Sequence, residues 1–168
     1  MSDWNWDIRA EKELGNFLDE NFYSILEKEN KEDVYDRNNV PIVKPIIDGF
    51  TRNVSSWSEQ YKGVDITVKI GDKVLIIDEK AQLKYINDPR PPTFAFELSY
   101  MKKGVLRDGW FVNDEKDTEY YGLFWIHESD EKDRKVIESN DFKKVECIII
   151  SKKSITDYLD GEGLGKID

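Results

Sequence analysis

The chain has a single cysteine, Cys147, and a single histidine, His127, among its 168 residues. One cysteine excludes an internal disulfide and indicates a reducing compartment. One cysteine with one histidine also excludes the usual structural zinc sites and any site that needs two imidazoles. We expect Cys147, inside an apolar run, to be inert core, and His127, at the end of an apolar strand, to have a structural or surface role.

The sequence also lacks a long apolar run and an excess of basic residues. No segment approaches the length that spans a membrane, and residues 1–13 lack the apolar core of a signal peptide, so we expect a cytoplasmic protein with no membrane partner. The net charge of −10 argues against a broad basic surface for nucleic acid. A glycine-rich phosphate loop is missing too, because GEGLGK at 161–166 lacks the flanking strand and helix.

Length and composition favour one folded domain over residues 1–168. The chain is 39% hydrophobic and 36% charged, which is apolar enough to bury a core and argues against general disorder. Apolar residues recur at spacings of three and four from about Asp7 to Glu29, and this pattern predicts an amphipathic helix. Residues 30–61 carry two prolines and many small polar residues, and predict loops with one short strand.

The second half of the chain predicts strands and one helix. Alternation or continuous apolar character predicts strands at 93–100, 119–127 and 145–151. Ser154 is expected to cap a last helix that ends at Gly161.

Residues 63–85, GVDITVKIGDKVLIIDEKAQLKY, predict two antiparallel strands joined by a turn at Gly71-Asp72. Glycine adopts the positive φ that the first central position of such a turn requires. With this turn, Ile66 faces Ile77 and Asp65 faces Asp78. The two-residue period of a strand then places Asp65, Asp78, Lys80 and Gln82 on one face, and six aliphatic side chains on the other.

Two carboxylates directly opposite each other on a sheet repel and destabilise the hairpin. A divalent cation between Asp65 and Asp78, with Lys80 nearby, compensates for this repulsion and indicates a metal-dependent hydrolase site. The alternative is an exposed network in which Lys80 neutralises both acids, a type of pairing that contributes little stability. That alternative has to place Val74 and Ile76 on a solvent face.

At these residues the sequence resembles the PD-(D/E)xK nuclease superfamily, whose core hairpin carries Asp on one strand and (Asp/Glu)-x-Lys on the next. Asp65 matches the first acid, Asp78 the second and Lys80 the lysine, whereas Val64 stands where the motif has Pro. The resemblance covers roughly the first 100 residues. It implies an α+β (mixed α/β) domain with a restriction-endonuclease-like core, in which helices flank a central mixed sheet of four to five strands.

The resemblance also implies roles for the residues on this hairpin. Asp65 and Asp78 would coordinate Mg²⁺ or Mn²⁺, with the backbone carbonyl of Glu79 as a further ligand, while the Glu79 side chain points away. Lys80 would orient the attacking water and help to deprotonate it, and Gln82 would hydrogen-bond phosphate or water. The implied function is a metal-dependent nuclease that hydrolyses phosphodiester bonds, with DNA favoured over RNA by the resemblance alone.

Two further acids are candidates for the same cluster. Superfamily members often supply one more acid from a helix before the hairpin, and Glu11 is the matching position, where it would serve a second metal. The alternative for Glu11 is a place at the margin of the apolar stripe, with its carboxylate in water. Glu97 would join the cluster if its strand lies beside Asp78, and a solvent-facing position is equally compatible with the sequence.

Basic residues are outnumbered by acidic ones, and we expect those near the hairpin to grip a nucleic-acid backbone. They are Lys84, Arg90, Lys102, Lys103 and Arg107. Within the 30–61 connector Arg37, Lys44 and Arg52 are within reach of a phosphate, although isolated basic residues on loops are more often solvated. Two alternatives to the nuclease stay open: a catalytically inactive member of the fold that binds protein or nucleic acid, and an acidic protein that mimics nucleic-acid charge.

Overall fold

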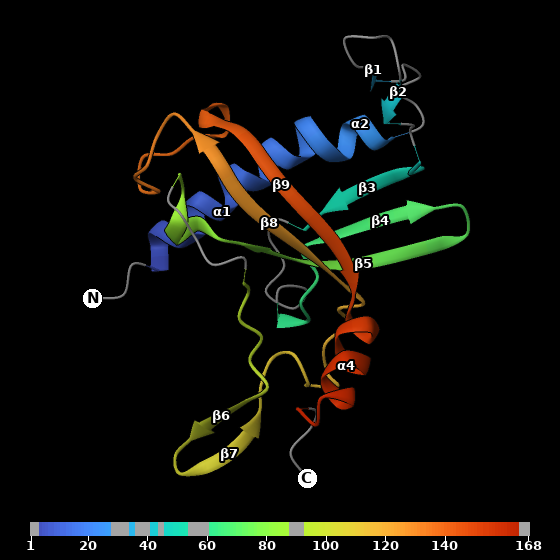
Figure 1. Ribbon diagram of the computed structural model, residues 1–168, viewed down its shortest axis with the longest axis vertical. Coiled ribbons are helices and arrows are strands. Elements are labelled where there is room, and N and C mark those ends of the chain that lie inside the picture. The colour runs from blue at the N-terminus through green and yellow to red at the C-terminus, as the bar shows by residue number, and fades with distance from the viewer. Residues whose placement is uncertain are drawn as a thin grey trace.

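A computed structural model describes residues 4–27, 34–35, 41–43, 46–53, 61–87 and 93–164 (Figure 1). The helical segments are α1 (Trp4–Leu18), a π-helical turn (Asp19–Tyr23), α2 (Ser24–Leu26), 3-10 turns at Leu83–Tyr85 and Ser139–Asp141, and α4 (Lys152–Gly161). The strands are β1 (Val34–Tyr35), β2 (Pro41–Val43), β3 (Gly49–Arg52), β4 (Ile66–Ile70), β5 (Lys73–Ala81), β6 (Ser99–Lys102), β7 (Val105–Asp108), β8 (Tyr120–Ser129) and β9 (Phe142–Ser151). Within these ranges, no helix has the length and apolar character needed to cross a lipid bilayer.

The central sheet has five strands in the order β3-β4-β5-β8-β9. Only the β5–β8 pair is parallel, and the other three pairs are antiparallel, so the sheet is mixed. A parallel pair needs a long crossover connection, which residues 82–119 supply. The predicted α+β class with a mixed sheet of four to five strands is therefore confirmed at this level. The described strands also form two small two-stranded sheets, β1–β2 and β6–β7.

The β4–β5 hairpin has the predicted register. Ile66 pairs with Ile77, Val68 with Leu75 and Ile70 with Lys73. Gly71 begins the turn with a φ of 60°. The sidedness predicted from this register is therefore present, and it decides where the candidate site lies.

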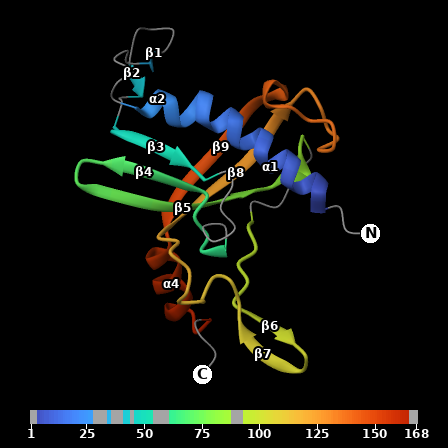
Figure 2. The ribbon, with the colours of Figure 1, turned by 180° about the vertical axis from the view of Figure 1, so that it is seen from behind.

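Helix α1 packs on one face of the central sheet and crosses its strands in Figure 2. Leu14 and Leu18 of α1 form one buried cluster with Ile66, Ile77 and Phe124 of the sheet. Because neighbouring side chains of a strand point to opposite faces, Asp78 and Lys80 lie on the face that α1 does not cover. The core of the molecule and the acidic hairpin face are thus on opposite sides of β5.

The first helix differs from the prediction in one respect. Helical structure runs from Trp4 to Leu26, close to the predicted 7–29, but a π-helical turn interrupts it at Asp19–Tyr23. Such a turn inserts an extra residue and re-aims the side chains around it. Here it directs Asp19 and Tyr23 toward the sheet, where both have charged partners.

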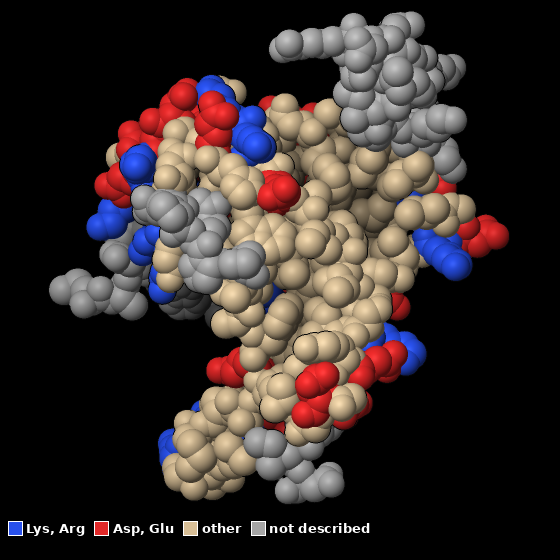
Figure 3. Space-filling view, in the orientation of Figure 1, with Lys and Arg blue, Asp and Glu red and all other residues tan. Residues whose placement is uncertain are grey.

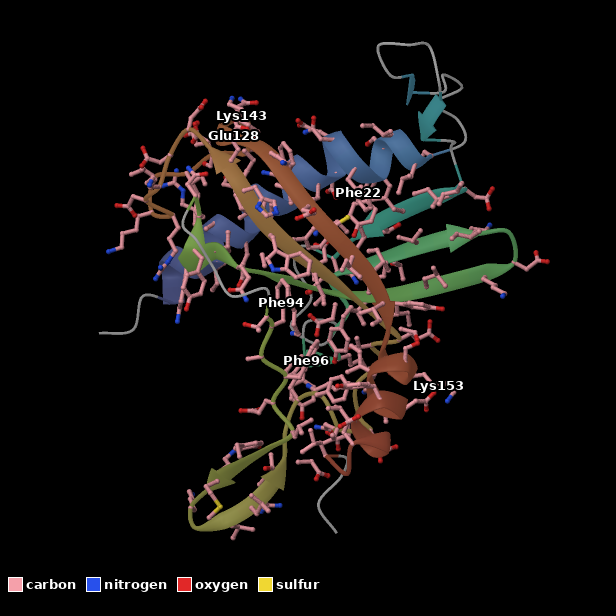
Figure 4. The ribbon with its side chains drawn as sticks, viewed as in Figure 1. Phe22, Phe94, Phe96, Glu128, Lys143 and Lys153 are labelled. Carbon is pink, nitrogen blue, oxygen red and sulfur yellow. The ribbon has the colours of Figure 1, made fainter. Side chains whose placement is uncertain are left out.

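The strand predicted at 93–100 is largely wrong. Only Ser99–Lys102 is a strand, and it pairs with β7 in a separate hairpin rather than joining the central sheet. The alternating aromatic residues instead pack beneath the sheet (Figure 4). The ring centroid of Phe94 lies 4.7 Å from that of Trp125, and that of Phe96 lies 5.0 Å from that of Tyr121. The alternating apolar residues of this segment therefore reflect the packing of one side of an extended chain that does not pair with another strand.

The C-terminal predictions hold except for one cap. Strand β8 (Tyr120–Ser129) begins one residue after the predicted 119–127 and extends two residues beyond it, β9 covers and extends the predicted 145–151, and α4 ends at Gly161. The N-cap of α4 is Ser151 and not Ser154, because the Ser151 hydroxyl oxygen accepts the Ser154 backbone N–H at 3.0 Å.

Candidate active site

Asp65 and Asp78 come together on the sheet face opposite α1. Asp65 immediately precedes β4, and its Oδ2 accepts the backbone N–H of Glu79 at 2.8 Å. Asp78 lies in β5, at the centre of the sheet between β4 and β8, and is only 5% exposed. The central strand therefore holds one carboxylate, and the start of its neighbour brings up the second.

Asp78 has two further partners on this face. The Lys80 Nζ lies 3.2 Å from its Oδ2, and the Trp110 indole Nε1 donates to the same oxygen at 3.3 Å. The Lys80 amine also lies 5.4 Å from the centroid of the Tyr121 ring, the residue that pairs with Asp78 across β5 and β8. The three residues predicted from the hairpin, Asp65, Asp78 and Lys80, are thus brought together.

Electrostatics at the acid pair are unusual. Burial, and then the negative charge of Asp78, raise the pKa of Asp65 to about 7, although the hydrogen bond from Glu79 N–H opposes the shift. Asp65 therefore retains a proton close to neutral pH when no cation is present. A cation bound between the two carboxyls has to displace that proton, so its affinity should rise with pH.

This proton gives a testable pH dependence for the metal-free protein. Between about pH 4 and 7 folded Asp65 binds more proton than unfolded Asp65, since its pKa rises from 3.8 to about 7 on folding. The free energy of unfolding should therefore fall as pH rises through this window, by up to about 1.4 kcal/mol per pH unit. Urea denaturation with EDTA at several pH values measures the slope. In Asp65→Asn the contribution of Asp65 to the pH dependence of the free energy of unfolding should vanish. An unchanged slope of this free energy against pH in the variant would contradict the assignment of the raised pKa to Asp65.

Sequence reasoning missed an aromatic and cationic cover over this site. Lys116 is buried, with its Nζ 3.2 Å from the centroid of the Trp110 ring and 3.7 Å from that of Tyr61. The Lys116 amine also donates to the backbone carbonyl of Tyr61. Lys116 therefore fixes the indole that donates to Asp78. Nothing in the sequence signals this role, because Lys116 sits in a charged stretch that is typical of a solvated loop.

The Tyr121 hydroxyl is buried and, among the residues described, has no hydrogen-bond partner. Burial, and then the negative charge of Asp78, raise the pKa of Tyr121, so it is a neutral donor. An unpaired buried donor beside an acid pair is costly to the fold and is suited to a water or a substrate oxygen.

The Glu79 side chain points to the opposite face, in agreement with the prediction. Its carboxylate accepts from the Tyr23 hydroxyl at 2.8 Å and pairs with Arg52 at 2.5 Å. Arg52 also pairs with Asp19 at 2.8 Å and is 14% exposed. The expectation that Arg52 is solvated or reaches a phosphate is therefore wrong, because it is the centre of an ion network between β3, β5 and the π-helical turn.

Two predicted site residues are not brought to the acid pair. Glu11 is exposed on α1, on the other face of the sheet from Asp78, so it is not part of the cluster. The side-chain amide of Gln82, beyond the end of β5, donates to the backbone carbonyl of Thr93. Over the described ranges, no group of three or more Asp, Glu, His or Cys side chains is placed to hold a metal ion. Among the residues that the structure describes, the acid cluster consists of Asp65 and Asp78.

Glu97 also stays outside the pair. It is exposed, and its carboxylate accepts from the backbone N–H of Trp110 at 3.4 Å. The expectations for His127 and Cys147 agree with their positions: His127 is exposed beside Glu146, and Cys147 is half-buried against the core.

The basic residues predicted to contact a nucleic-acid backbone lie at two places in the described structure. Lys84 is exposed on the 3-10 turn after β5, while Lys102, Lys103 and Arg107 are exposed on the β6–β7 hairpin. Arg37, Lys44 and Arg90 lie outside the described residues.

Two hollows lie away from the acid pair. One of about 860 Å³ is lined by β5, β8 and the start of α4, including Lys152 and Lys153, and Figure 4 shows Lys153 on the outer side of that helix. The other, of about 450 Å³, lies between the first helix and β9 and is lined by Phe22 and Lys143. Neither contains Asp65, Asp78 or Lys80, so the candidate chemistry does not coincide with either hollow.

Comparison of the chain with protein-family models, with curated proteins and with solved structures finds no match. The residues of the site are therefore the basis for assigning a function.

Proposed function

We propose that this chain is a metal-dependent nuclease with a restriction-endonuclease-like core, and that it hydrolyses phosphodiester bonds, with DNA favoured over RNA. The observation that carries the proposal is the meeting of Asp65, Asp78 and Lys80 on one face of a hairpin with the expected register. The lone Cys147 favours a reducing compartment such as the cytoplasm for this activity.

The donor set fits a hard divalent cation, Mg²⁺ or Mn²⁺. Asp65 and Asp78 offer two carboxylates, and burial together with mutual repulsion makes them costly without a counter-ion. The N–H and C=O of a strand residue face the same neighbouring strand, so the Glu79 carbonyl faces the side of Asp65, as its N–H does. Two carboxylates and one carbonyl support one cation. A second cation held by Glu11 has no support, since α1 lies on the other face.

When bound, the cation would neutralise phosphate charge and lower the pKa of a coordinated water. The residues of the chain have separate tasks. Lys80 orients the attacking water: its amine, when neutral, takes up the proton of that water, and the ammonium that forms offsets charge on the phosphorus. Trp110 holds one oxygen of Asp78, and Glu79 N–H holds one oxygen of Asp65. Attack forms one P–O bond and breaks the ester P–O bond, which leaves the phosphate on one fragment.

Two other functions are weighed against this one. The net charge of −10 favours a mimic of nucleic-acid charge. On the face seen in Figure 3, however, acidic and basic residues are interspersed and do not form a continuous acidic surface. A catalytically inactive binding protein of the same fold does not require Lys80 at the buried acid pair. We therefore favour the nuclease.

The proposal is tested by incubating the purified protein with linear duplex DNA, single-stranded DNA and RNA. Cleavage should require Mg²⁺ or Mn²⁺, stop with EDTA and be lost in Asp78→Asn. Asp72→Asn is the matched control, because Asp72 is an exposed acid in the turn of the same hairpin. Cleavage that survives EDTA, or no cleavage of DNA or RNA by the wild type in either metal, would refute the proposal.

A further inference from the structure

The β6–β7 hairpin projects from the rest of the molecule (Figures 1 and 2). Every residue of β7 is exposed, and so are Tyr100, Met101 and Lys102 of β6. An isolated two-stranded hairpin is only marginally stable in water. An arm of this kind, which buries little surface of its own, needs a firm base and has its surface available to a partner.

The base of the arm is fixed directly to the candidate site. Gly109 N–H donates to the Leu98 carbonyl at 2.8 Å, and Phe111 N–H donates to the Glu97 carbonyl at 3.0 Å. A Cβ on Gly109 would lie 2.1 Å from that Glu97 oxygen, so only glycine permits this approach. Trp110, between the two donors, places its indole on Asp78. The arm is thus held in a defined position relative to the acid pair.

The two faces of the arm have different chemistry. Tyr100 pairs with Arg107 and Lys102 with Val105, and paired residues share a face, so this face is basic and aromatic. Met101 pairs with Leu106 on the other, apolar face. Residues 99–108 contain three basic residues and one acid in a chain of net charge −10. At the lower left of Figure 3 this part of the surface is largely uncharged, with basic atoms along one edge.

We propose that the β6–β7 arm enters the major groove of duplex DNA with the Tyr100, Lys102 and Arg107 face toward the DNA. The proposal rests on the proposed nuclease function and specifies its substrate as a duplex. The major groove of B-DNA is about 12 Å wide and admits a two-stranded ribbon, whose strands lie about 4.8 Å apart. The deep, narrow major groove of an RNA duplex does not admit such a ribbon.

The dimensions of the arm suit this placement. Four residues in each strand give an arm about 13 Å long. The chain from Lys103 at the tip to Trp110 at the acid pair spans at most about 25 Å when fully extended. Both lengths are less than one turn of B-DNA, about 34 Å. One duplex can therefore contact the arm and present a phosphodiester to Asp78 within a single helical turn.

The test compares two triple variants in fluorescence anisotropy with a labelled DNA duplex in Ca²⁺. Lys102→Ala/Lys103→Ala/Arg107→Ala should weaken duplex affinity by about tenfold or more and reduce the salt slope of log K by about 2 to 3. Lys69→Ala/Lys73→Ala/Lys144→Ala removes the same charge from exposed positions outside the arm, and should leave duplex affinity within about twofold.

The outcomes separate this proposal from the nuclease proposal. If the wild type cleaves DNA and both triple variants bind the duplex equally well, the groove assignment is overturned and the nuclease stands. If Met101→Ser/Leu106→Ser abolishes self-association in sedimentation velocity while the basic triple variant binds normally, the arm is instead an interface between copies, which also overturns it. A wild type that neither binds nor cleaves DNA overturns both.

Discussion

Replacing Lys80 with alanine is expected to lower kcat for DNA cleavage by about 10²- to 10⁴-fold, the usual contribution of a positioned acid–base group. The amine lies 3.2 Å from Asp78 on the face where the attacking water is proposed to sit. KM should change much less, because the arm and the other basic residues still bind the DNA. Single-turnover cleavage with saturating Mg²⁺ and enzyme in excess measures the effect.

The matched control is Lys69→Ala, which removes an exposed lysine from the partner strand of the same hairpin and should leave kcat unchanged. Lys80→Arg adds a second comparison, since it keeps the charge but cannot take up a proton at neutral pH. An alanine variant with near-wild-type kcat would show that Lys80 only balances the charge of Asp78.

Replacing Arg52 with leucine should destabilise the fold by about 3 to 5 kcal/mol. The Arg52 guanidinium is 14% exposed and bonds to both Glu79 and Asp19, so its removal leaves two carboxylates without a counter-charge. Burial opposes the charge on Arg52, but the hydrogen bonds to Glu79 and Asp19 outweigh burial and raise its pKa. Urea denaturation at neutral pH measures the loss.

Arg9→Leu is the control for this prediction. Arg9 pairs with Glu138 at 3.9 Å, with both side chains largely exposed, and such surface pairs contribute below about 1 kcal/mol. In Arg52→Leu/Glu79→Gln part of the loss should be recovered, because the uncompensated charge beside Tyr23 is gone. Equal losses for Arg9→Leu and Arg52→Leu would contradict the view that this network supports β5 behind Asp78.

Much of the candidate site was predictable because it depends on local rules. A two-residue turn and the two-residue period of a strand determine which residues of the hairpin share a face, and they place Asp65 beside Asp78 and turn Glu79 away. The same reasoning gave the helix at the N-terminal end, β8 and β9, since each carries a strong apolar pattern over its own length.

The remaining features depend on contacts between distant segments. Arg52 pairs with Asp19, which is 33 residues away in the sequence, and with Glu79, which is 27 residues away. No local sequence pattern distinguishes it from a solvated arginine. Trp110 reaches Asp78 because residues 93–98 run outside the central sheet and the chain returns toward the sheet after the β6–β7 hairpin. Glu11 was wrongly assigned to the site for a similar reason. Its place on the helix was predicted correctly, but the face of the sheet that α1 covers was not predicted.

The most direct test of the account is the position of Mn²⁺ in crystals grown with the ion, located by anomalous diffraction at the manganese edge. The account predicts one peak between Asp65 and Asp78, roughly 2.1 Å from an oxygen of each. Its loss in Asp78→Asn would tie the peak to the acid pair. Crystals that hold Mn²⁺ elsewhere or nowhere, at a concentration that saturates cleavage, would contradict the metal-dependent mechanism.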